Sequence, residues 1–447
     1  MNDLHAEPDA VRVLAALEAT PDRVVEITSE LVRRDTAYAR DTPYAGPAAP
    51  HGQEADAQAW IGAFLERLGF DVQIWEPDPA EVAGHPMYPD GLTWEGRPVL
   101  AAVKRGSGGG RSLILNGHLD TVRCEPLERW TRDPWTPTVE GDRLYGRGSC
   151  DMKGGIAAAL AAAEAIVQSG AELAGDLHVQ IAPDEETTGM GVVALLRRGE
   201  RADACLVPEP SSFQVYAAYR GILYGNVTVA GLPGHAEIPQ AHHSLGGGVN
   251  AIDQMRKVMD AFDALSEEWQ GRPDKQHPLL STPRIFPTRI AGGEFIASLP
   301  GACTMDFDLT YLPGEAEEGG WGGNVRREVE EHLARAAAAD PWLREHPPVV
   351  TWTQDYPAAE TPLDTAFGGV LCDASAAQGV ESAIDGFDTW ADAGTYLLDG
   401  IPAYCYGPGA IERAHMIDEW VSVDELRTCA AVIARVVTDW CGAPAAD

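Results

Sequence analysis

The chain has 447 residues, 45% of them hydrophobic, and its 33 basic and 68 acidic side chains give a formal net charge of −35. This length and apolar content are typical of a globular protein of two or three domains and exclude a disordered, collagenous or coiled-coil chain. The negative charge would repel a phosphate backbone, so we expect no nucleic-acid partner.

The sequence shows no clear membrane-spanning segment, secretory signal or disulfide pattern. Glu164 interrupts even the alanine-rich segment 156–167, so no apolar run reaches the roughly 18 residues of a membrane span, and we expect no membrane association. The N-terminus has acidic residues where a secretory signal carries basic ones, which favours a cytoplasmic protein. The eight cysteines are scattered without a Cys-x-x-Cys pair, which predicts reduced thiols rather than a zinc ribbon or disulfides.

Strand and helix patterns alternate along the first half of the chain. We expect helices over 54–69, 153–169 and 192–197, and strands over 70–75, 99–103, 113–115, 177–182 and 204–207. This alternation predicts an α/β fold with a largely parallel sheet that is covered by helices.

After residue 213 the order changes to β-α-β-β-α-β, the order of a ferredoxin-like unit. The expected strands are 216–229, 284–290, 302–311 and 349–354, and the expected helices are 249–269 and 324–338. Apolar segments at 366–376, 401–406 and 423–437 then return to the first sheet. We therefore expect an inserted domain at 214–355 between two parts of one domain, 1–213 and 356–447.

The strongest local motif is Asn116-Gly117-His118-Leu119-Asp120, at the end of an expected strand. Residues two apart in an extended segment share a face, so the Asp120 carboxylate can accept one ring N–H of His118 and leave the other nitrogen for a metal. A hydrogen-bonded surface pair would produce the same motif.

Asp151 lies in a glycine-dense segment directly before a long expected helix. It can be a helix N-cap, but the glycines also allow the backbone to approach an ion closely. The segment completes neither a dinucleotide fingerprint nor a P-loop, and the neighbouring Cys150 fits no nucleophile motif.

Three consecutive acids, Asp184, Glu185 and Glu186, follow the expected strand 177–182. Adjacent like charges are costly unless a cation or solvent compensates them. One of these carboxylates can bind a metal while its neighbour holds a water within reach of proton transfer. A solvated acidic loop is the alternative.

Glu209 and His415 also follow expected strands, and the carboxyl ends of strands are where an open α/β sheet keeps its site. Taken alone, His415 would be read as structural. Imidazole and carboxylate ligands suit zinc, cobalt or manganese, and one acid can bridge two ions about 3.5–4 Å apart. The candidate ligands are His118, Asp151, Glu186, Glu209 and His415.

In the order and spacing of these motifs the chain resembles the M20 metallopeptidases, which include acetylornithine deacetylase, succinyl-diaminopimelate desuccinylase, aminoacylase-1 and bacterial glutamate carboxypeptidase. The resemblance implies a zinc-peptidase-like catalytic domain, a ferredoxin-like lid and dimerisation domain, and two divalent ions, zinc first and cobalt or manganese as alternatives. It assigns Asp151 to both ions, His118 and Glu209 to one, Glu186 and His415 to the other, Asp120 to orienting His118, and Glu185 to general base.

A further match is Gly231-Leu232-Pro233-Gly234-His235 in the expected inserted domain. The resemblance implies that His235 reaches the active site of a partner subunit and donates to the developing oxyanion, which implies a homodimer formed through the lid domain. A turn histidine on an exposed hairpin is the alternative.

Two positions depart from the family. Ala297 replaces the asparagine of a Gly-Gly-x-x-x-Asn-x-x-Pro motif, and Thr310 stands where many relatives have an arginine. Those two side chains usually clasp the carboxylate of the substrate, so the departures put a free-acid substrate in doubt. Arg220 or Arg289 could substitute for the missing groups.

The sequence therefore predicts a metal-dependent amidohydrolase acting on a small molecule, with an N-acyl amino acid or related amide as substrate. A dipeptidase or carboxypeptidase of the same family is the alternative. A serine hydrolase is disfavoured because no Gly-x-Ser-x-Gly motif occurs. From another class, a non-catalytic binding protein on this fold remains open.

Overall fold

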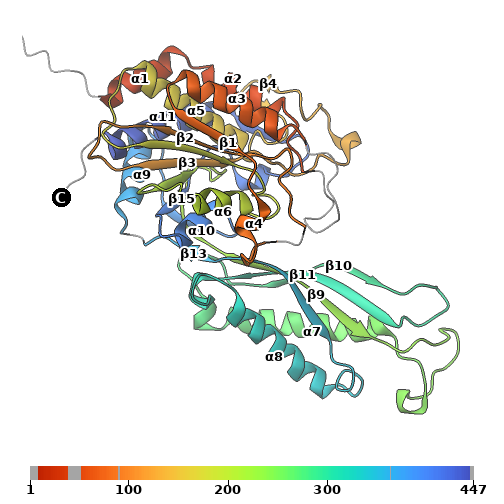
Figure 1. Ribbon diagram of the computed structural model, residues 1–447. Coiled ribbons are helices and arrows are strands. Elements are labelled where there is room, and N and C mark those ends of the chain that lie inside the picture. The colour runs from red at the N-terminus through yellow and green to blue at the C-terminus, as the bar shows by residue number, and fades with distance from the viewer. Residues whose placement is uncertain (1–8, 39–51, 89–90, 363, 443–447) are drawn as a thin grey trace, which may run out of the picture. The chain divides into compact units, whose positions relative to one another are not determined.

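A computed structural model describes residues 9–38, 52–88, 91–362 and 364–442 (Figure 1). The chain divides into two compact units. The larger unit, named the catalytic unit here after the role that the sequence predicts for it, contains Met1–Ala217, Thr361–Gly386 and Ala391–Asp447. The inserted unit contains Ala218–Glu360 and Phe387–Trp390. None of the described helices is both long and apolar enough to span a bilayer.

The catalytic unit is built on a sheet of order β1-β2-β6-β3-β7-β15-β8. The strands β6, β3, β7 and β15 are parallel, and the pairs β1-β2, β2-β6 and β15-β8 are antiparallel. Every residue of β3, β6 and β7 is buried, which explains their continuous apolar runs. The strands are β1 (Asp71–Trp75), β2 (Val99–Lys104), β3 (Leu113–His118), β6 (Leu177–Ala182), β7 (Cys205–Val207), β8 (Val215–Tyr219) and β15 (Ala403–Cys405), and β14 (Ile384–Phe387) pairs with β8. The last two residues of β8 belong to the inserted unit, where they pair with β13 (Ala359–Glu360).

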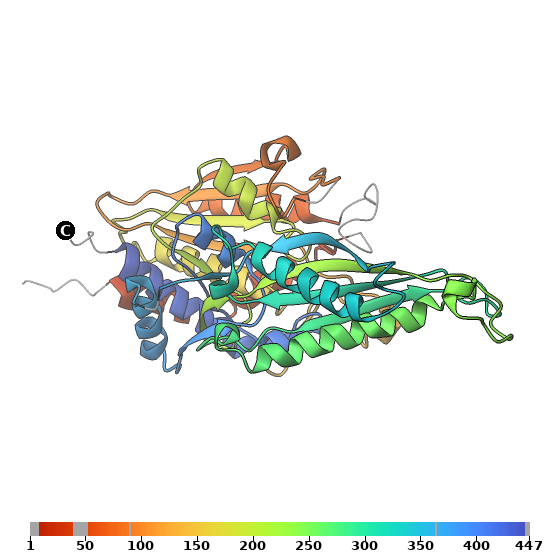
Figure 2. The same cartoon turned by 90° about the horizontal axis from the view of Figure 1, so that it is seen from below.

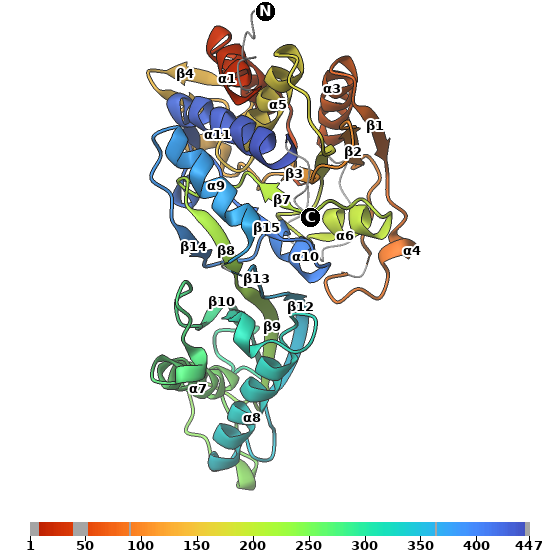
Figure 3. The same cartoon turned by 90° about the vertical axis from the view of Figure 1, so that its left-hand side faces the viewer.

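Helices cover both faces of this sheet, as Figures 1 and 3 show. The alanine-rich α5 (Lys153–Gln168) packs on β3 with α1, α2 and α11 around it, and α6 and α10 lie on the opposite face. Almost all of α5 is buried, and its Glu164 pairs with Arg23 at 2.7 Å. The other helices are α1 (Asp9–Ala19), α2 (Arg23–Val32), α3 (Glu54–Arg67), α4 (Pro79–Val82), α6 (Met190–Arg197), α9 (Ala366–Ala377), α10 (Asp392–Leu398) and α11 (Val423–Cys441). The expected covered α/β sheet is confirmed, with parallel pairing confined to its centre.

A small antiparallel sheet that the sequence did not predict joins distant segments of this unit. Its strands are β4 (Thr138–Glu140), β5 (Arg143–Tyr145) and β16 (Trp420–Ser422), in the order β16-β5-β4. These short strands are partly exposed and lack the continuous buried apolar run by which the equally short β7 was predicted. The pairing places the segment before β16 beside the segment before α5, and the Gly146 N–H donates to the Glu419 carbonyl at 2.9 Å.

The inserted unit has the expected β-α-β-β-α-β order and a fully antiparallel sheet, β10-β11-β9-β12. Both helices lie on one face of that sheet (Figure 2). The core between the helices and the sheet includes Phe262 and Phe307, whose ring centroids are 4.9 Å apart. The elements are β9 (Gly221–Ala230), α7 (Ala251–Gln270), β10 (Ile285–Gly292), β11 (Ala302–Tyr311), α8 (Gly323–Ala339) and β12 (Val349–Tyr356).

The expected single strand over 216–229 is wrong. The structure has two strands, β8 and β9, which are separated at Arg220 and pair in different sheets. Arg220 and Gly221 interrupt the apolar run at this point, but one charged residue and one glycine do not by themselves show that a strand ends. The split is imposed by the partners of each half, because β8 pairs with β15 while β9 pairs with β11 and β12.

Candidate metal centre

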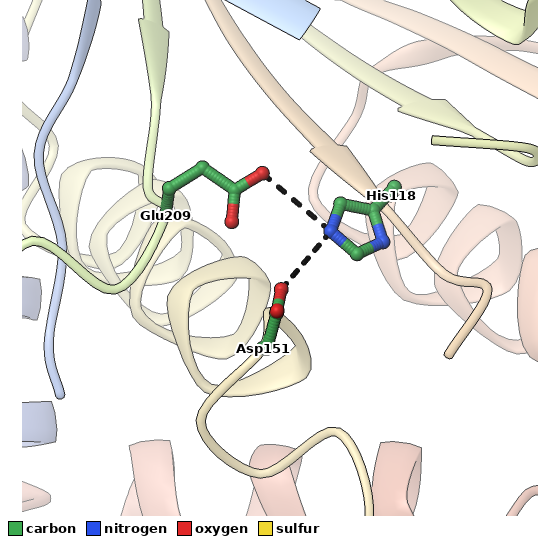
Figure 4. A group of neighbouring side chains, drawn as sticks. All are labelled: His118, Asp151 and Glu209. Atoms are coloured by element: carbon green, nitrogen blue, oxygen red, sulfur yellow. Dashed lines mark ion pairs between the residues drawn. The ribbon is translucent and has the colours of Figure 1, made fainter. Parts of the chain in front are cut away.

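Three side chains from different elements meet beyond the ends of the central strands. His118 is the last residue of β3, Glu209 follows β7, and Asp151 precedes α5. Nε2 of His118 lies 3.2 Å from Oδ1 of Asp151 and 3.5 Å from Oε1 of Glu209, and Figure 4 shows both carboxylates facing the ring. One ligand atom from each residue lies within 4.8 Å of the others, a spacing that can hold a metal ion.

Asp151 also belongs to a second triad, with Glu186 and His415. Nε2 of His415 lies 3.0 Å from Oε2 of Glu186 and 3.4 Å from Oδ2 of Asp151. The two oxygens of Asp151 therefore face different histidines. A carboxylate placed in this way can be shared between two ions.

The two triads differ in exposure. The side chain of His118 is 1% exposed and that of His415 is 53% exposed. Solvent and small molecules can therefore approach the second triad more directly than the first.

The carboxylates and imidazoles of the triads shift one another's pKa. Burial lowers the pKa of His415, but the carboxylates of Asp151 and Glu186 outweigh this effect and raise it to about 10. Burial and the charge of Asp151 raise the pKa of Glu186 to about 7. These groups hold protons that a divalent cation would displace on binding.

The donor set fits a pair of divalent transition metals. Nδ1 of His118 lies 3.0 Å from the carbonyl oxygen of Asp120, which fixes the ring proton on Nδ1 and leaves a lone pair on Nε2. Nε2 is buried and makes no hydrogen bond with any described residue, although it faces two carboxylates. Imidazole nitrogen and carboxylate oxygen are the ligands that zinc, cobalt and manganese accept.

Asp120 contacts His118 through a different group from the one that the sequence predicts. Its backbone carbonyl, not its carboxylate, accepts the ring N–H of His118, and the nearer carboxylate oxygen is 3.6 Å from Nδ1. The carboxylate instead accepts the backbone N–H groups of Glu185 and Glu186, at 3.2 and 3.1 Å. Asp120 thus fixes both the histidine ring and the acidic loop after β6.

Glu185 lies beside the first triad without belonging to it. Its Oε2 is 3.9 Å from Nε2 of His118, and its side chain is largely buried. Burial raises the pKa of Glu185 well above its ordinary value. A carboxylate in this position can accept a proton from a nearby water.

The segment that carries both triads matches a known family. The family model of peptidase family M20/M25/M40 matches residues 114–439.

The chain belongs to this family. It is a hydrolase that acts on amide bonds.

Two relatives are similar to this M20 hydrolase over most of its length. An N-formyl-4-amino-5-aminomethyl-2-methylpyrimidine deformylase from Halalkalibacterium halodurans is 30% identical, covering 96% of this chain and 98% of the relative. An acetylornithine deacetylase from Pectobacterium carotovorum is 30% identical, covering 86% of this chain and 89% of the relative.

Solved structures of this family share the fold. A di-peptidase from Saccharomyces cerevisiae superposes with a TM-score of 0.72 at 13% identity, covering 98% of this chain and 99% of that chain. A dinuclear metal-binding M20 peptidase from Bacillus subtilis gives a TM-score of 0.64 at 14% identity, covering 95% and 99%. These likenesses establish the architecture of the M20 hydrolase.

Glu419 is a site residue to which the sequence gave no role. Its Oε1 accepts the backbone N–H groups of Cys150 and Asp151, at 2.9 and 3.1 Å, and its Oε2 pairs with Arg147 at 2.5 Å. Glu419 therefore holds the backbone of the shared carboxylate. The acid stands just before β16, and only the unpredicted small sheet brings it to Asp151.

Asp392 is a second buried acid near the centre. It begins α10 and is 1% exposed, and neither carboxylate oxygen has a hydrogen-bond partner among the described residues. Burial raises the pKa of Asp392 well above its ordinary value, and the charge of Glu209 adds to that shift. Asp392 thus adds to the acidic character of the site.

The arginines considered as substitutes for a carboxylate clasp are both engaged inside the inserted unit. Arg220 is buried and donates to Asp388 at 3.0 Å, to the Thr310 hydroxyl at 2.7 Å and to Ser281. Arg289 is exposed and pairs with Asp306 at 2.6 Å. Each guanidinium therefore has a carboxylate of its own.

Proposed function

We propose that this M20 hydrolase removes a small acyl group from an amine by using two divalent metal ions. The sharing of Asp151 between the two triads carries this proposal, since each of its oxygens faces a different histidine. The deformylase and the deacetylase among the relatives support the choice of a formyl or acetyl group.

In this proposal His118 and Glu209 bind one ion, Glu186 and His415 bind the other, and Asp151 binds both. Zinc is the expected metal, with cobalt and manganese as alternatives, because the donors are imidazoles and carboxylates. The bound ions supply a Lewis acid for the amide carbonyl and lower the pKa of a water toward neutrality.

Glu185 is the proposed general base. It takes a proton from the attacking water and delivers it to the departing amine. Its position supports this role, because its carboxylate lies beside His118 while the neighbouring Glu186 is turned to His415. Asp120 positions both by accepting their backbone N–H groups.

His235 is the proposed donor to the oxyanion, supplied from the inserted unit of a partner subunit. Its Nδ1 accepts the N–H of Glu237 at 3.3 Å, so a neutral ring carries its proton on Nε2. The residue is exposed, which leaves that N–H available as a donor. Donors of this kind stabilise the charge that develops on a tetrahedral intermediate.

A homodimer through the inserted unit follows from that role. Strand β10 is an edge of the sheet, and Phe286 and Ile290 on it are 47% and 53% exposed. Exposed edges with apolar side chains favour pairing with another chain, which supports a second copy as partner. A cytoplasmic location stays a prediction.

We infer that the amine part of the substrate lacks a free carboxylate. Ala297 and Thr310 remove the groups expected to clasp one, and Arg220 and Arg289 already pair with Asp388 and Asp306. This favours an uncharged or cationic amine, as opposed to an N-acyl amino acid. A dipeptidase or carboxypeptidase activity is the second candidate, favoured by the fold shared with the yeast di-peptidase.

Hydrolysis of a defined panel tests the reaction. The panel contains N-formyl-4-amino-5-aminomethyl-2-methylpyrimidine, N-acetyl-L-ornithine and the dipeptide Ala-Ala, each assayed with zinc-, cobalt- and manganese-loaded protein. We expect the formyl amide to be cleaved with the highest kcat/KM. Faster cleavage of Ala-Ala would favour the peptidase, and no cleavage despite full metal loading would favour a non-catalytic binding protein.

A further inference from the structure

A buried cluster outside the two triads holds the loop that carries Glu185 and Glu186. The carboxylate of Asp184 accepts the indole N–H of Trp94 at 2.8 Å and also bonds to the guanidinium of Arg97. Asp184, Trp94 and Arg97 are 1%, 1% and 5% exposed. We call these three residues the Asp184 clamp.

The backbone of Asp184 explains why the loop needs such a clamp. Asp184 has a φ of +73°, in the left-handed region that L-residues other than glycine rarely adopt. This conformation is unfavourable for a residue with a Cβ atom. It persists because the carbonyl of Asp184 accepts N–H groups from Thr188 and Gly189, at 2.8 and 2.7 Å, while the clamp fixes the side chain.

The left-handed turn separates the two acids that follow it. Oε2 of Glu185 lies 3.9 Å from Nε2 of His118, whereas Oε2 of Glu186 lies 3.0 Å from Nε2 of His415. Glu185 therefore lies beside the first triad, whereas Glu186 is part of the second. A rotation of the turn would move both carboxylates together.

The clamp is itself tied to a helix. A second nitrogen of the Arg97 guanidinium lies 3.3 Å from Oε1 of Glu54, the buried first residue of α3. The guanidinium thus bridges Glu54 and Asp184. Its planar set of N–H donors allows this bridge, and a lysine ammonium could not reproduce it. Helix α3 packs on β1 and β2. Through Arg97 and Glu54, the loop after β6 is therefore anchored to the central sheet.

We propose that Trp94 and Arg97 are positioning residues, which act through Asp184 to set the direction of Glu185 and Glu186 relative to the two metal sites. The inference rests on the proposed function in taking Glu185 as the general base. Neither residue touches a triad. Their effect on the reaction passes through the turn at Asp184.

The experiment compares Trp94→Phe with Trp269→Phe. Each substitution removes one indole N–H from a carboxylate partner. The partner is the buried Asp184 in one case and the partly buried Glu328, at 3.0 Å, in the other. Trp269 is also fully buried but belongs to the inserted unit, whereas the acidic loop belongs to the catalytic unit. It is therefore a control for the loss of a hydrogen bond from a buried tryptophan to a carboxylate.

For Trp94→Phe we expect kcat to fall about 10-fold to 100-fold at saturating zinc, with KM within twofold of wild type, because small misplacements of reacting groups cost rate rather than binding. The affinity for the second zinc ion, measured by competition with a chelating dye, should weaken at least threefold because Glu186 moves as well. Trp269→Phe should change neither quantity by more than twofold.

Arg97 gives a second pair of variants. Arg97→Met should lose more kcat than Arg97→Lys, because the lysine keeps the charge beside Asp184 but loses the fork to Glu54. A purely structural role would lower the thermal midpoint of each variant without changing kcat per folded, metal-loaded molecule. Equal kcat in Arg97→Lys, Arg97→Met and wild type would overturn the proposal.

Two results for the tryptophan pair would also overturn it. One is a Trp94→Phe enzyme with wild-type kcat and wild-type zinc affinity, and the other is an equal loss in Trp94→Phe and Trp269→Phe. Failure of the proposed function is distinguishable, because the wild type would then cleave no amide of the panel. The zinc affinities would still decide whether the clamp positions Glu186.

Discussion

The inserted unit pairs most of its buried acids with its own lysine and arginine side chains, whereas the catalytic unit does so for Glu419 but not for the acids of its two triads. In the inserted unit the nearly fully buried Lys275 pairs with Glu315 and, at 2.7 Å, with Glu328. Asp355 is likewise buried and pairs with Arg326 at 2.7 Å. Charges removed from water are tolerated when they are paired in this way.

The catalytic unit gathers acids around two histidines. The side chains of Asp151, Glu186 and Glu209 are no more than 10% exposed, and the ion pairs that these three make are with His118 and His415. Two imidazoles cannot neutralise this set even when both are protonated. The comparison indicates that a buried excess of negative charge marks a place where cations bind. An acid that is paired with a lysine or arginine of its own unit instead supports the surrounding structure.

Glu185→Gln should have the largest effect. The substitution keeps the shape of the side chain but removes the proposed proton acceptor, so kcat should fall about 10³-fold. Because Glu185 belongs to neither triad, metal content per chain should not change. Turnover assays together with elemental analysis measure both quantities, and normal turnover in this variant would refute the role of Glu185.

Removal of the metals should destabilise the catalytic unit. The acids of the triads then repel one another, whereas zinc at about 1,000 times its dissociation constant should stabilise the fold by about 4 kcal/mol. Urea unfolding of chelated and zinc-reconstituted protein measures this difference. Identical unfolding midpoints in the two samples would show that the buried acids are not compensated by metal.

Lys275→Met should have its effect on the inserted unit alone. It leaves Glu315 and Glu328 without the ammonium that they share, which should destabilise the protein by about 3 kcal/mol. The kcat of the folded, metal-loaded enzyme should remain that of wild type. The double variant Lys275→Met with Glu315→Gln should regain part of the stability, and a variant with normal stability but reduced kcat would contradict the comparison.

Asp308 is an exception within the inserted unit and gives the smallest expected effect. Its Oδ1 is buried without a hydrogen-bond partner among the described residues, and burial raises its pKa to about 6. The folded state therefore binds more protons than the unfolded state between pH 4 and 6, so stability should fall as pH rises through that window.

Asp308→Asn should remove this pH dependence. At pH 7 it should stabilise the protein by about 1 kcal/mol, because the asparagine carries no charge to bury. Denaturant unfolding at pH 4, 5, 6 and 7 compares the two proteins. Parallel stability curves would show that Asp308 is compensated in the folded state.

The sequence predicted those parts of the fold in which burial produces a regular pattern of apolar residues. The apolar runs of β3, β6 and β7 and the β-α-β-β-α-β order of the inserted unit are visible because buried strands and amphipathic helices have distinct periods. The separation of β8 from β9 was not visible, because it depends on which strands pair with each half.

The candidate site shows a similar limit. The five triad residues could be named because each follows or precedes a recognisable element, and the structure brings them together. The contacts that hold them could not be predicted. Trp94 lies 90 residues from Asp184, and Glu419 lies 268 residues from Asp151, with no local motif linking the partners.

The number of metal ions bound per chain tests the central claim most directly. Elemental analysis after equilibration with zinc and removal of free metal should give two ions per chain for the wild type. His118→Ala and His415→Ala should each retain one, since each removes a ligand from only one triad. A wild-type chain that retains no zinc, cobalt or manganese would contradict the account.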